Sequence, residues 1–239
     1  MTIMRIDKMI SNSGHGSRSE IKKYLKYGNV KVNGEVVKAA TTKVDIEKDL
    51  VELFRERIIY KKNIYLIMNK PAGVVSATKD NSYETVIDLL DDFYKSFNPF
   101  PVGRLDIDTE GLLLITNDGK FSYNLLSPKK HVPKTYYALI DAPIDENDVS
   151  EFKKGLNIND EYITKPAILD IINSGENESE IHVTIEEGKY HQVKRMFKSS
   201  GKHVTYLKRI KMANLELDEN LKNGEYREIS EEEMELLNK

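Results

Sequence analysis

The stretch Gly103–Gly119, GRLDIDTEGLLLITNDG, decides how this chain folds. Its apolar run, Leu112–Ile115, fits one buried strand, and the NDG that closes the stretch is a strong turn signal. Two carboxylates, Asp106 and Asp108, precede the run, and Arg104 lies two residues before the first of them. A neighbouring cation favours the ionised form of a carboxylate. The stretch therefore predicts a charged acid at the mouth of a buried strand.

Segments typical of strands outnumber helical ones on both sides of this stretch, and the two kinds do not alternate regularly. The sequence predicts strands over residues 64–68, 134–140, 167–172, 180–186 and 204–210. It predicts helices over residues 85–90, 121–126, 144–156, 190–199 and 230–237. This pattern indicates an α+β fold in which a mixed, largely antiparallel sheet is flanked by helices.

The first fifty or so residues have the pattern of a small separate module. A helix is predicted over residues 5–11, and Ser17-Arg18-Ser19-Glu20 is a capping box that opens a second helix, which Gly28 ends. A hairpin that turns at Asn33-Gly34 and a strand over residues 44–53 follow. We therefore expect a small N-terminal domain, a charged linker and a larger domain, with bounds 1–53, 54–63 and 64–239.

Composition excludes several classes of site. The 239 residues include no Cys, which excludes disulfides, thiolate zinc sites and thiol nucleophiles. The five His show no metal-ligand spacing, so we expect no metal. No glycine-rich phosphate-binding loop occurs, which disfavours nucleotide cofactors. No apolar run reaches the roughly 20 residues that span a bilayer, and no secretory signal is visible, so we expect a cytoplasmic protein with no membrane partner. No heptad pattern is present, and we expect a monomer.

The charge is unevenly distributed, although the net formal charge is −3. Residues 5–38 contain eight Lys or Arg and three acids, and residues 189–211 contain eight Lys or Arg and no acid. Residues 141–187 contain thirteen acids and three Lys. Segregated charge gives a protein a positive face that attracts a polyanion such as RNA. Solvated helix faces are the competing interpretation of each basic run.

Three groups of residues are candidates for chemistry, and the pattern alone leaves each open. Either Asp106 or Asp108 is the reactive acid or a turn residue, and two carboxylates also fit a glycosidase-like site. Tyr136 is either a half-buried strand residue or a ring that stacks on an extruded base. Lys194 and Arg195 are adjacent on a predicted helix, so only one of them faces the sheet.

In this order along the chain, NKPAG (69–73), the Asp106 stretch, KTYYA (134–138), KPAIL (165–169) and EGKYHQVKRMF (187–197) resemble the RsuA-type pseudouridine synthases. The N-terminal module resembles the alpha-L RNA-binding module of a small-subunit ribosomal protein. The likeness covers nearly the whole chain and implies the pseudouridine synthase fold, with no metal and no cofactor.

The resemblance also implies a role for each candidate. Asp106, rather than Asp108, matches the catalytic Asp, and Arg104 is expected to contact it or to fill the space that the flipped base leaves. Tyr136 matches the ring that stacks on the target uracil. Lys194 matches the cation that pairs with the Asp, with Arg195 as the alternative. The basic side chains expected to bind RNA are Arg5, Lys8, Arg18, Lys22, Lys23, Lys31, Lys189, His191 and Arg195.

The implied reaction is the isomerisation of one uridine to pseudouridine in rRNA, as naked RNA or within an assembly intermediate of the ribosome. The HQVKRM and KPAIL motifs look more like the enzyme that acts on small-subunit (16S) rRNA than like its large-subunit (23S) relatives, which remain the alternative. A non-catalytic RNA-binding or ribosome-assembly protein would explain the basic segments equally well.

Overall fold

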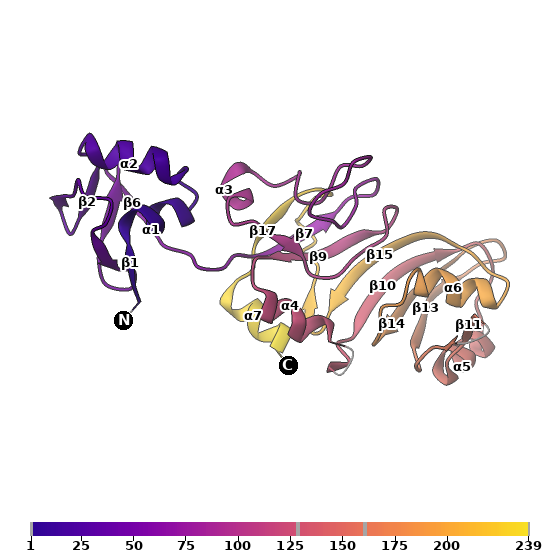
Figure 1. Cartoon of the computed structure of the whole chain (residues 1–239). Coiled ribbons are helices and arrows are strands. Elements are labelled where there is room, and N and C mark those ends of the chain that lie inside the picture. Colours follow the sequence, from indigo (N-terminus) through magenta and orange to yellow (C-terminus); the bar gives the residue numbers. More distant parts are fainter. Residues whose placement is uncertain (1, 128–129, 160–161, 239) are drawn as a thin grey trace. The chain divides into compact units, whose positions relative to one another are not determined.

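The computed structural model describes residues 2–127, 130–159 and 162–238. The chain forms two compact units. One contains Met1–Ile64 and Leu90–Pro99, and the other contains Tyr65–Leu89 and Phe100–Lys239 (Figure 1). None of the described helices is long and apolar enough to cross a bilayer.

The first unit packs three helices with two small sheets. Its helices are α1 (Ile6–Asn12), α2 (Arg18–Lys26) and α3 (Asp92–Lys95). Its strands are β1 (Ile3–Arg5), β2 (Val30–Val32), β3 (Glu35–Val36), β4 (Lys43–Asp45), β5 (Val51–Leu53) and β6 (Glu56–Ile58). Strands β1 and β4 form one antiparallel pair, and the other four lie in the order β3-β2-β5-β6. The buried core is built from α1, α2 and both sheets, with members such as Ile10, Leu25, Val44 and Val51.

Local sequence signals account for most of this unit. The Ser17 hydroxyl accepts the Glu20 N–H, and the Glu20 carboxylate accepts the Ser17 N–H, which confirms the predicted capping box. Gly28 has φ +76° after the last turn of α2, as a helix-ending glycine does. The hairpin between β2 and β3 turns at Asn33 and Gly34, whose φ values are +50° and +87°.

Two predictions for this unit differ from the structure. The single strand expected over residues 44–53 is two strands, β4 and β5, because the Asp49 carboxylate accepts the backbone N–H of Asp45 and closes a turn between them. Residues 54–63 were expected to be a linker, but β6 lies within them and pairs antiparallel with β5. The charged composition of this segment reflects its exposed face, whereas Ile58 is buried in the core.

The second unit is built on a nine-stranded sheet. The strands of the whole unit, including two outside this sheet, are β7 (Tyr65–Lys70), β8 (Phe100–Pro101), β9 (Glu110–Thr116), β10 (Lys134–Ile140), β11 (Asn157–Asn159), β12 (Tyr162–Ile163), β13 (Ile168–Ser174), β14 (Ser179–Ile185), β15 (Val204–Met212), β16 (Leu215–Glu216) and β17 (Tyr226–Glu228). Its helices are α4 (Gly119–Leu126), α5 (Glu146–Lys154), α6 (Gln192–Ser199) and α7 (Glu231–Asn238). The main path of the sheet is β13-β14-β10-β15-β9-β7-β17, while β11 and β12 form a separate pair.

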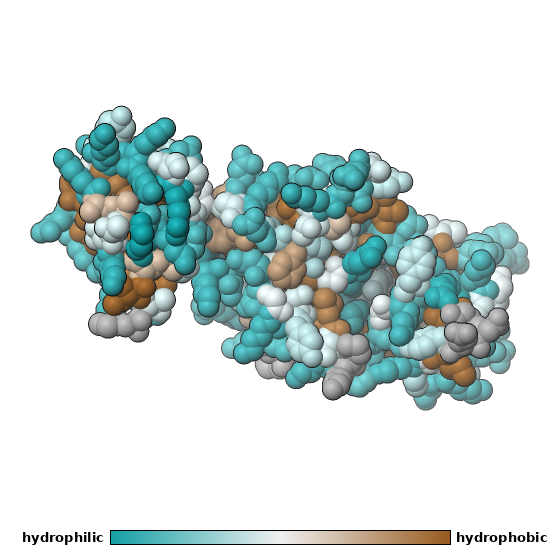
Figure 2. Space-filling view, in the orientation of Figure 1, coloured by the Kyte–Doolittle hydropathy of each residue, from teal (hydrophilic) through white to brown (hydrophobic). Residues whose placement is uncertain are grey.

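The α+β expectation and the mixed, largely antiparallel sheet are confirmed. Figure 1 shows α4 and α7 close together below one half of the sheet, and α5 and α6 beside the other half. Leu125 of α4 and Leu237 of α7 share a core with Leu112, Leu114 and Met212 of the sheet. The surface seen in Figure 2 is mostly hydrophilic, with apolar residues scattered among polar ones, so most of the apolar side chains serve the core.

The predicted helix over residues 85–90 is wrong. These residues form turns. The N–H and hydroxyl of Thr85 donate to the Asp88 carboxylate, and the Asp88 N–H donates to the Thr85 hydroxyl, which closes a single turn that does not propagate. Strand β17 was also missed, since it follows a turn and contains only three residues. The other predicted helices and strands of this unit exist, with ends that differ by a few residues.

One contact joins the two halves of the sheet. Among the described strands of this sheet, β9 and β15 form the one parallel pair, with Lys208 opposite Glu110 and Arg209 opposite Gly111. Gly111 has φ +100°, and a Cβ atom there would lie 2.2 Å from the Arg209 carbonyl oxygen and 2.8 Å from its nitrogen. The two backbones therefore approach so closely that only glycine fits.

Substitution of Gly111 by Ala tests this close approach. The added methyl group would overlap backbone atoms that cannot move aside, so we expect Gly111→Ala to lower the free energy of unfolding by about 4 kcal/mol or more. Gly224 is the matched control, because it has φ +86° and nothing lies within 4 Å of its Cβ position. Gly224→Ala should lose only about 1–2 kcal/mol. Equal losses for both variants in urea unfolding would contradict the close approach.

Candidate active site

The loop between β8 and β9 carries Asp106, and the side chains of Ser76 and Lys70 and the backbone N–H of Gly73 hold it. The Ser76 hydroxyl accepts a hydrogen bond from the Leu105 N–H at 3.1 Å and donates one to the Leu105 carbonyl at 3.0 Å. The Gly73 N–H donates to the Ile107 carbonyl at 2.7 Å. The loop thus has its backbone groups paired on both sides of Asp106, which fixes where the carboxylate emerges.

The ammonium of Lys70 also holds this loop, through hydrogen bonds to backbone carbonyls. Lys70 is completely buried, and its Nζ donates to the carbonyls of Pro71 and Thr109 at 2.9 Å and of Ile107 at 3.4 Å. Burial lowers the pKa of Lys70 to about 8, against the attraction of Asp108, Glu110 and Asp106. The NKPAG motif therefore serves the Asp106 loop through Lys70 and Gly73. In the sequence, this motif contributed to the family resemblance, but no role was predicted for Lys70.

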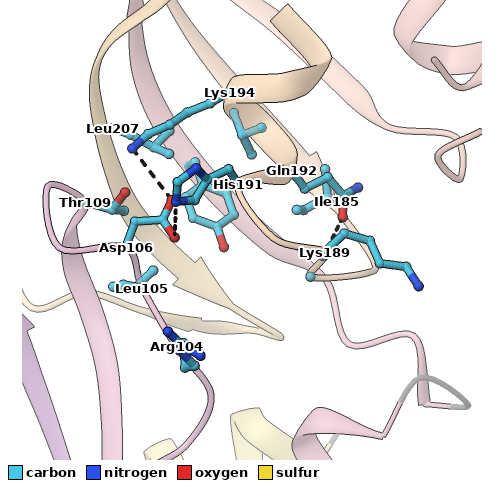
Figure 3. Close-up of a pocket in the computed structure, with 13 residues that line it drawn as sticks. Arg104, Leu105, Asp106, Thr109, Ile185, Lys189, His191, Gln192, Lys194 and Leu207 are labelled. Carbon is cyan, nitrogen blue, oxygen red and sulfur yellow. Dashed lines mark hydrogen bonds and ion pairs between the residues drawn. The ribbon is translucent and has the colours of Figure 1, made fainter. Parts of the chain in front are cut away.

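Asp106 lies between two side chains of the segment that opens α6. Its Oδ2 is 3.6 Å from Lys194 Nζ, and its Oδ1 is 3.5 Å from His191 Nε2. Figure 3 shows both side chains pointing toward the carboxylate from the same side. The Asp106 side chain is 27% exposed, so it is reachable from solvent while it faces the pocket. This is the arrangement expected of an acid that reacts with a bound molecule.

Lys194 is shared between the two carboxylates of the loop. Its Nζ donates to Asp108 Oδ1 at 2.5 Å, a closer contact than the one to Asp106. Burial alone would raise the pKa of Asp108, but the hydrogen bond and charge of Lys194 outweigh this effect and hold the pKa below its usual value. Asp108 therefore orients Lys194 beside Asp106. This partnership between the two candidate acids was not foreseen from the sequence.

A buried glutamine sets the position of His191 and Lys194. Gln192 donates to Glu187 Oε1 at 2.7 Å and accepts the Lys189 N–H at 2.9 Å, so it ties the preceding strand end to the start of α6. His191 precedes the helix with φ +49°, an unfavourable conformation for a residue with a side chain. Such strain persists where the surroundings enforce it, which is common at functional sites.

The adjacent cations Lys194 and Arg195 have different partners. Arg195 donates from Nη2 to the Ile158 carbonyl at 3.0 Å and from Nη1 to the Tyr190 carbonyl. Its guanidinium therefore binds the backbone of β11 and of the residue before His191, while Lys194 reaches Asp106. Among the two adjacent cations, Lys194 is the one placed at the carboxylate.

Tyr136 forms another wall of the same pocket. It lies in the middle of β10, opposite Val183 of β14 and Arg209 of β15, and is 7% exposed. The pocket is lined by Asp106, Tyr136, Lys194, His191 and the apolar side chains of Ile185 and Leu207. An aromatic ring, two aliphatic side chains and one carboxylate suit a flat, weakly polar ring such as a nucleobase.

Arg104 lines this pocket but does not contact Asp106. The structure gives its guanidinium no hydrogen bond or ion pair with any of the described residues, and the side chain is exposed. Figure 3 shows Arg104 apart from the Asp106 carboxylate. Of the two placements expected from the sequence, the direct contact is absent here.

The predicted RNA-binding residues fall into two groups. Lys189 and His191 are in the second unit, at the pocket, and Lys189 also lies 4.6 Å from the centre of the Tyr162 ring. In the first unit, the exposed cations on or next to the helices are Lys8, Arg18, Lys22 and Lys23, with Lys31 half-buried on β2. Arg5 differs from these, because it donates twice to the buried carboxylate of Asp7.

Within the described residues, no group of three or more His, Cys, Asp or Glu is arranged to hold a metal ion.

The pH dependence of stability tests the Lys70 brace. The folded chain releases the Lys70 proton near pH 8, whereas the unfolded chain keeps it to about pH 10.5, so this lysine makes stability rise with pH between those values. We expect the stability advantage of wild type over Lys70→Met to grow by about 2 kcal/mol between pH 7.5 and 9.5 in urea unfolding. The exposed Lys79 is the control, and Lys79→Met should show no such growth. A Lys70→Met difference that is constant with pH would contradict a buried ammonium.

Similar proteins match this chain over almost its whole length. Residues 64–199 match the family model described as RNA pseudouridylate synthase, and residues 4–51 match the S4 domain. The chain is 49% identical to the uncharacterized RNA pseudouridine synthase YtzG of Bacillus subtilis over 235 residues, with 98% of each chain covered. It is 37% identical to ribosomal small subunit pseudouridine synthase A of Escherichia coli K12, covering 97% of this chain and 98% of that one. A crystal structure of a pseudouridylate synthase matches 98% of this chain and 99% of its own, with 36% identity and a TM-score of 0.68. The chain therefore belongs to the RsuA-type RNA pseudouridine synthases and carries an S4 domain at its N-terminus.

Proposed function

We propose that this enzyme converts one specific uridine of small-subunit rRNA to pseudouridine and that Asp106 is the group that reacts. The observation that carries the proposal is the Asp106 carboxylate, held between Lys194 and His191 in a pocket whose other wall is Tyr136. The choice of the small subunit is supported by the E. coli relative named for that subunit, which is 37% identical along nearly the full length.

The reaction is an isomerisation and needs no added atoms. The bond from C1′ of the ribose to N1 of uracil breaks, the base turns, and C1′ bonds to C5. C5 then loses its proton and N1 gains one, so the product has the same atoms as uridine. An ionised Asp106 serves as nucleophile or base in this sequence. Lys194 and His191, which lie within 3.6 Å of its two oxygens, stabilise its charge in the partly buried pocket.

The target must leave the RNA stack before it reaches Asp106. Extrusion of a base costs a few kcal/mol, and a ring that stacks on the extruded base offsets part of this. Tyr136 is the proposed stacking ring, supported by its place on the pocket wall. Arg104 is proposed to occupy the space that the base vacates, since its side chain is exposed at the rim and has no partner among the described residues.

The S4 domain is proposed to hold the RNA while the larger domain acts. We propose that the S4 domain comprises residues 1–53 together with β6, which pairs with β5, that the catalytic domain comprises residues 64–239, and that the exposed cations of both parts contact RNA. Phosphate contacts of this kind provide affinity without reading sequence. The enzyme is proposed to act as a monomer, and in the cytoplasm, where its rRNA substrate is made.

Substitution of Asp106 tests the catalytic assignment. Asp106→Asn keeps the shape of the side chain but removes its charge, so we expect pseudouridine formation to fall at least about 10³-fold. RNA affinity should stay within a few-fold, because the cations that bind the backbone remain. Asp170→Asn, an exposed residue of β13, is the matched control and should keep wild-type activity. Near wild-type turnover by Asp106→Asn would remove this residue from its role.

Mapping of modified nucleotides tests the substrate. Cells that lack this protein should lose one pseudouridine from small-subunit rRNA and none from large-subunit rRNA. Loss from the large subunit would assign the alternative substrate. An unchanged pseudouridine map in both RNAs, together with a ribosome-assembly defect, would favour a non-catalytic RNA-binding role.

A further inference from the structure

A second cavity lies beside the Asp106 pocket, and two buried cations line it. The two cavities share four wall residues, which are Arg104, Tyr136, Gly188 and Lys189. Lys134 and Arg209 line only the second cavity. A molecule that fills both cavities would therefore pass the ring of Tyr136 and meet these two cations.

Both cations belong to the sheet that supports Tyr136. Lys134 begins β10 two residues before Tyr136, so the two side chains lie on the same face of the strand. Arg209 is directly opposite Tyr136 on β15. Lys134 is only 9% exposed and Arg209 only 2%. Two charges of the same sign are thus buried on either side of the proposed stacking ring.

Neither cation has an anionic partner within the described part of the chain. Lys134 Nζ donates to the Val132 carbonyl at 2.8 Å, and Arg209 Nε donates to the Leu112 carbonyl at 2.7 Å. Arg209 Nη2 is buried and has no hydrogen-bond partner. Burial first, and then the charge of Arg209, lower the pKa of Lys134 to about 8, while Glu186 opposes this. The two cations therefore repel each other in a place that water barely reaches.

Among the described residues, neither carboxylate that lines the second cavity forms an ion pair with Lys134 or Arg209. Glu187 accepts the Lys165 N–H at 3.1 Å, the Gln192 side chain at 2.7 Å and the Tyr162 hydroxyl. Glu186 is half exposed and lies 3.7 Å from His131 Nδ1. A buried cation without a matched anion costs several kcal/mol. A protein retains such a charge where a ligand supplies the missing anion.

We propose that the second cavity binds a backbone phosphate of the RNA next to the target uridine, with Lys134 donating to the phosphate oxygen and Arg209 contributing its charge. The inference rests on the proposed function, because it requires a uridine of an RNA strand in the first cavity. A backbone phosphate lies one sugar away from the base, and the shared wall of Tyr136 allows one strand to supply both. The bound phosphate would hold the nucleotide so that its base meets Tyr136 and Asp106.

Neutral linkages in the RNA test this phosphate site. A substrate oligonucleotide is made with a single uncharged methylphosphonate at each position near the target uridine in turn, and kcat/KM for pseudouridine formation is measured with the full chain. One linkage should lower kcat/KM of wild type by about 10-fold or more. On unmodified RNA, kcat/KM of Lys134→Met should be lower than that of wild type by a similar factor. Introducing the same neutral linkage should then lower kcat/KM of this variant by less than about 3-fold.

Two further variants separate binding from structure. Lys208→Met makes the same charge change on β15, but its side chain lines a different cavity, so it should keep the full sensitivity to the neutral linkage. Lys134→Arg restores the charge and should recover most of the lost kcat/KM. Lys134→Met should melt at the wild-type temperature or above, because it removes an unmatched buried charge.

The outcomes are distinct. The proposal is overturned if no neutral linkage lowers kcat/KM of wild type. It is also overturned if the neutral linkage lowers kcat/KM of Lys134→Met by the same factor as it lowers that of wild type, because Lys134 then acts independently of that phosphate. A lower melting temperature of Lys134→Met with unchanged sensitivity to the neutral linkage would also overturn it, by assigning Lys134 a structural role. Absence of pseudouridine with every RNA and wild-type protein would instead reject the proposed function itself.

Discussion

The close approach of β9 and β15 is the constraint on which the rest of the catalytic unit depends. At Gly111 the two backbones are so near that a single methyl group would overlap the Arg209 carbonyl. On one side of this contact lie β7 and β9 with the Asp106 loop, and on the other lie β15, β10 and β14 with Tyr136 and the segment leading to α6. A wider spacing would separate the acid from the ring and from Lys194. The parallel pair therefore sets the width of the pocket.

Charge within the unit is arranged around the same contact. The buried ammonium of Lys70 exchanges water for the carbonyl of Pro71 and two carbonyls of the Asp106 loop, so its burial is compensated by hydrogen bonds. Lys194 faces two carboxylates. Each of these cations has its partners within the chain. Lys134 and Arg209 contrast with them, because their positive charge is left unmatched beside the ring that is proposed to receive the base.

Much of the fold was predictable because local signals and the global structure agree. The buried run at Leu112–Ile115 became the centre of β9, the alternating residues 134–140 became β10 with the same ends, and the capping box opened α2 as predicted. Predictions failed where short-range hydrogen bonds override a pattern. The Thr85 and Asp88 pair closes one turn instead of starting a helix, and the charged segment after residue 53 contains β6.

The candidate site was only partly readable from the sequence. Asp106, Tyr136 and Lys194 do meet at one pocket, although their separation in the sequence gives no measure of their distance in space. The tasks of Lys70 and Asp108 depend on contacts between residues far apart in the sequence, which no spacing rule reveals. Gln192 bonds instead to the nearby Glu187 and Lys189, a local contact that hydrophobic periodicity does not indicate. Arg5 shows the opposite case, since a basic residue in a basic run is engaged by the buried Asp7 rather than free on the surface.

We propose that the target uridine enters the pocket between Asp106 and Tyr136, and the roles proposed for the other residues depend on this placement. The most direct measurement is photo-crosslinking of an rRNA fragment in which the target position carries 4-thiouridine, followed by identification of the attached peptides. Crosslinks to the Asp106 loop, to β10 around Tyr136 or to the segment of Leu207 are the predicted result. Crosslinks confined to the S4 domain, or to the sheet face that carries Lys208, would contradict the claim.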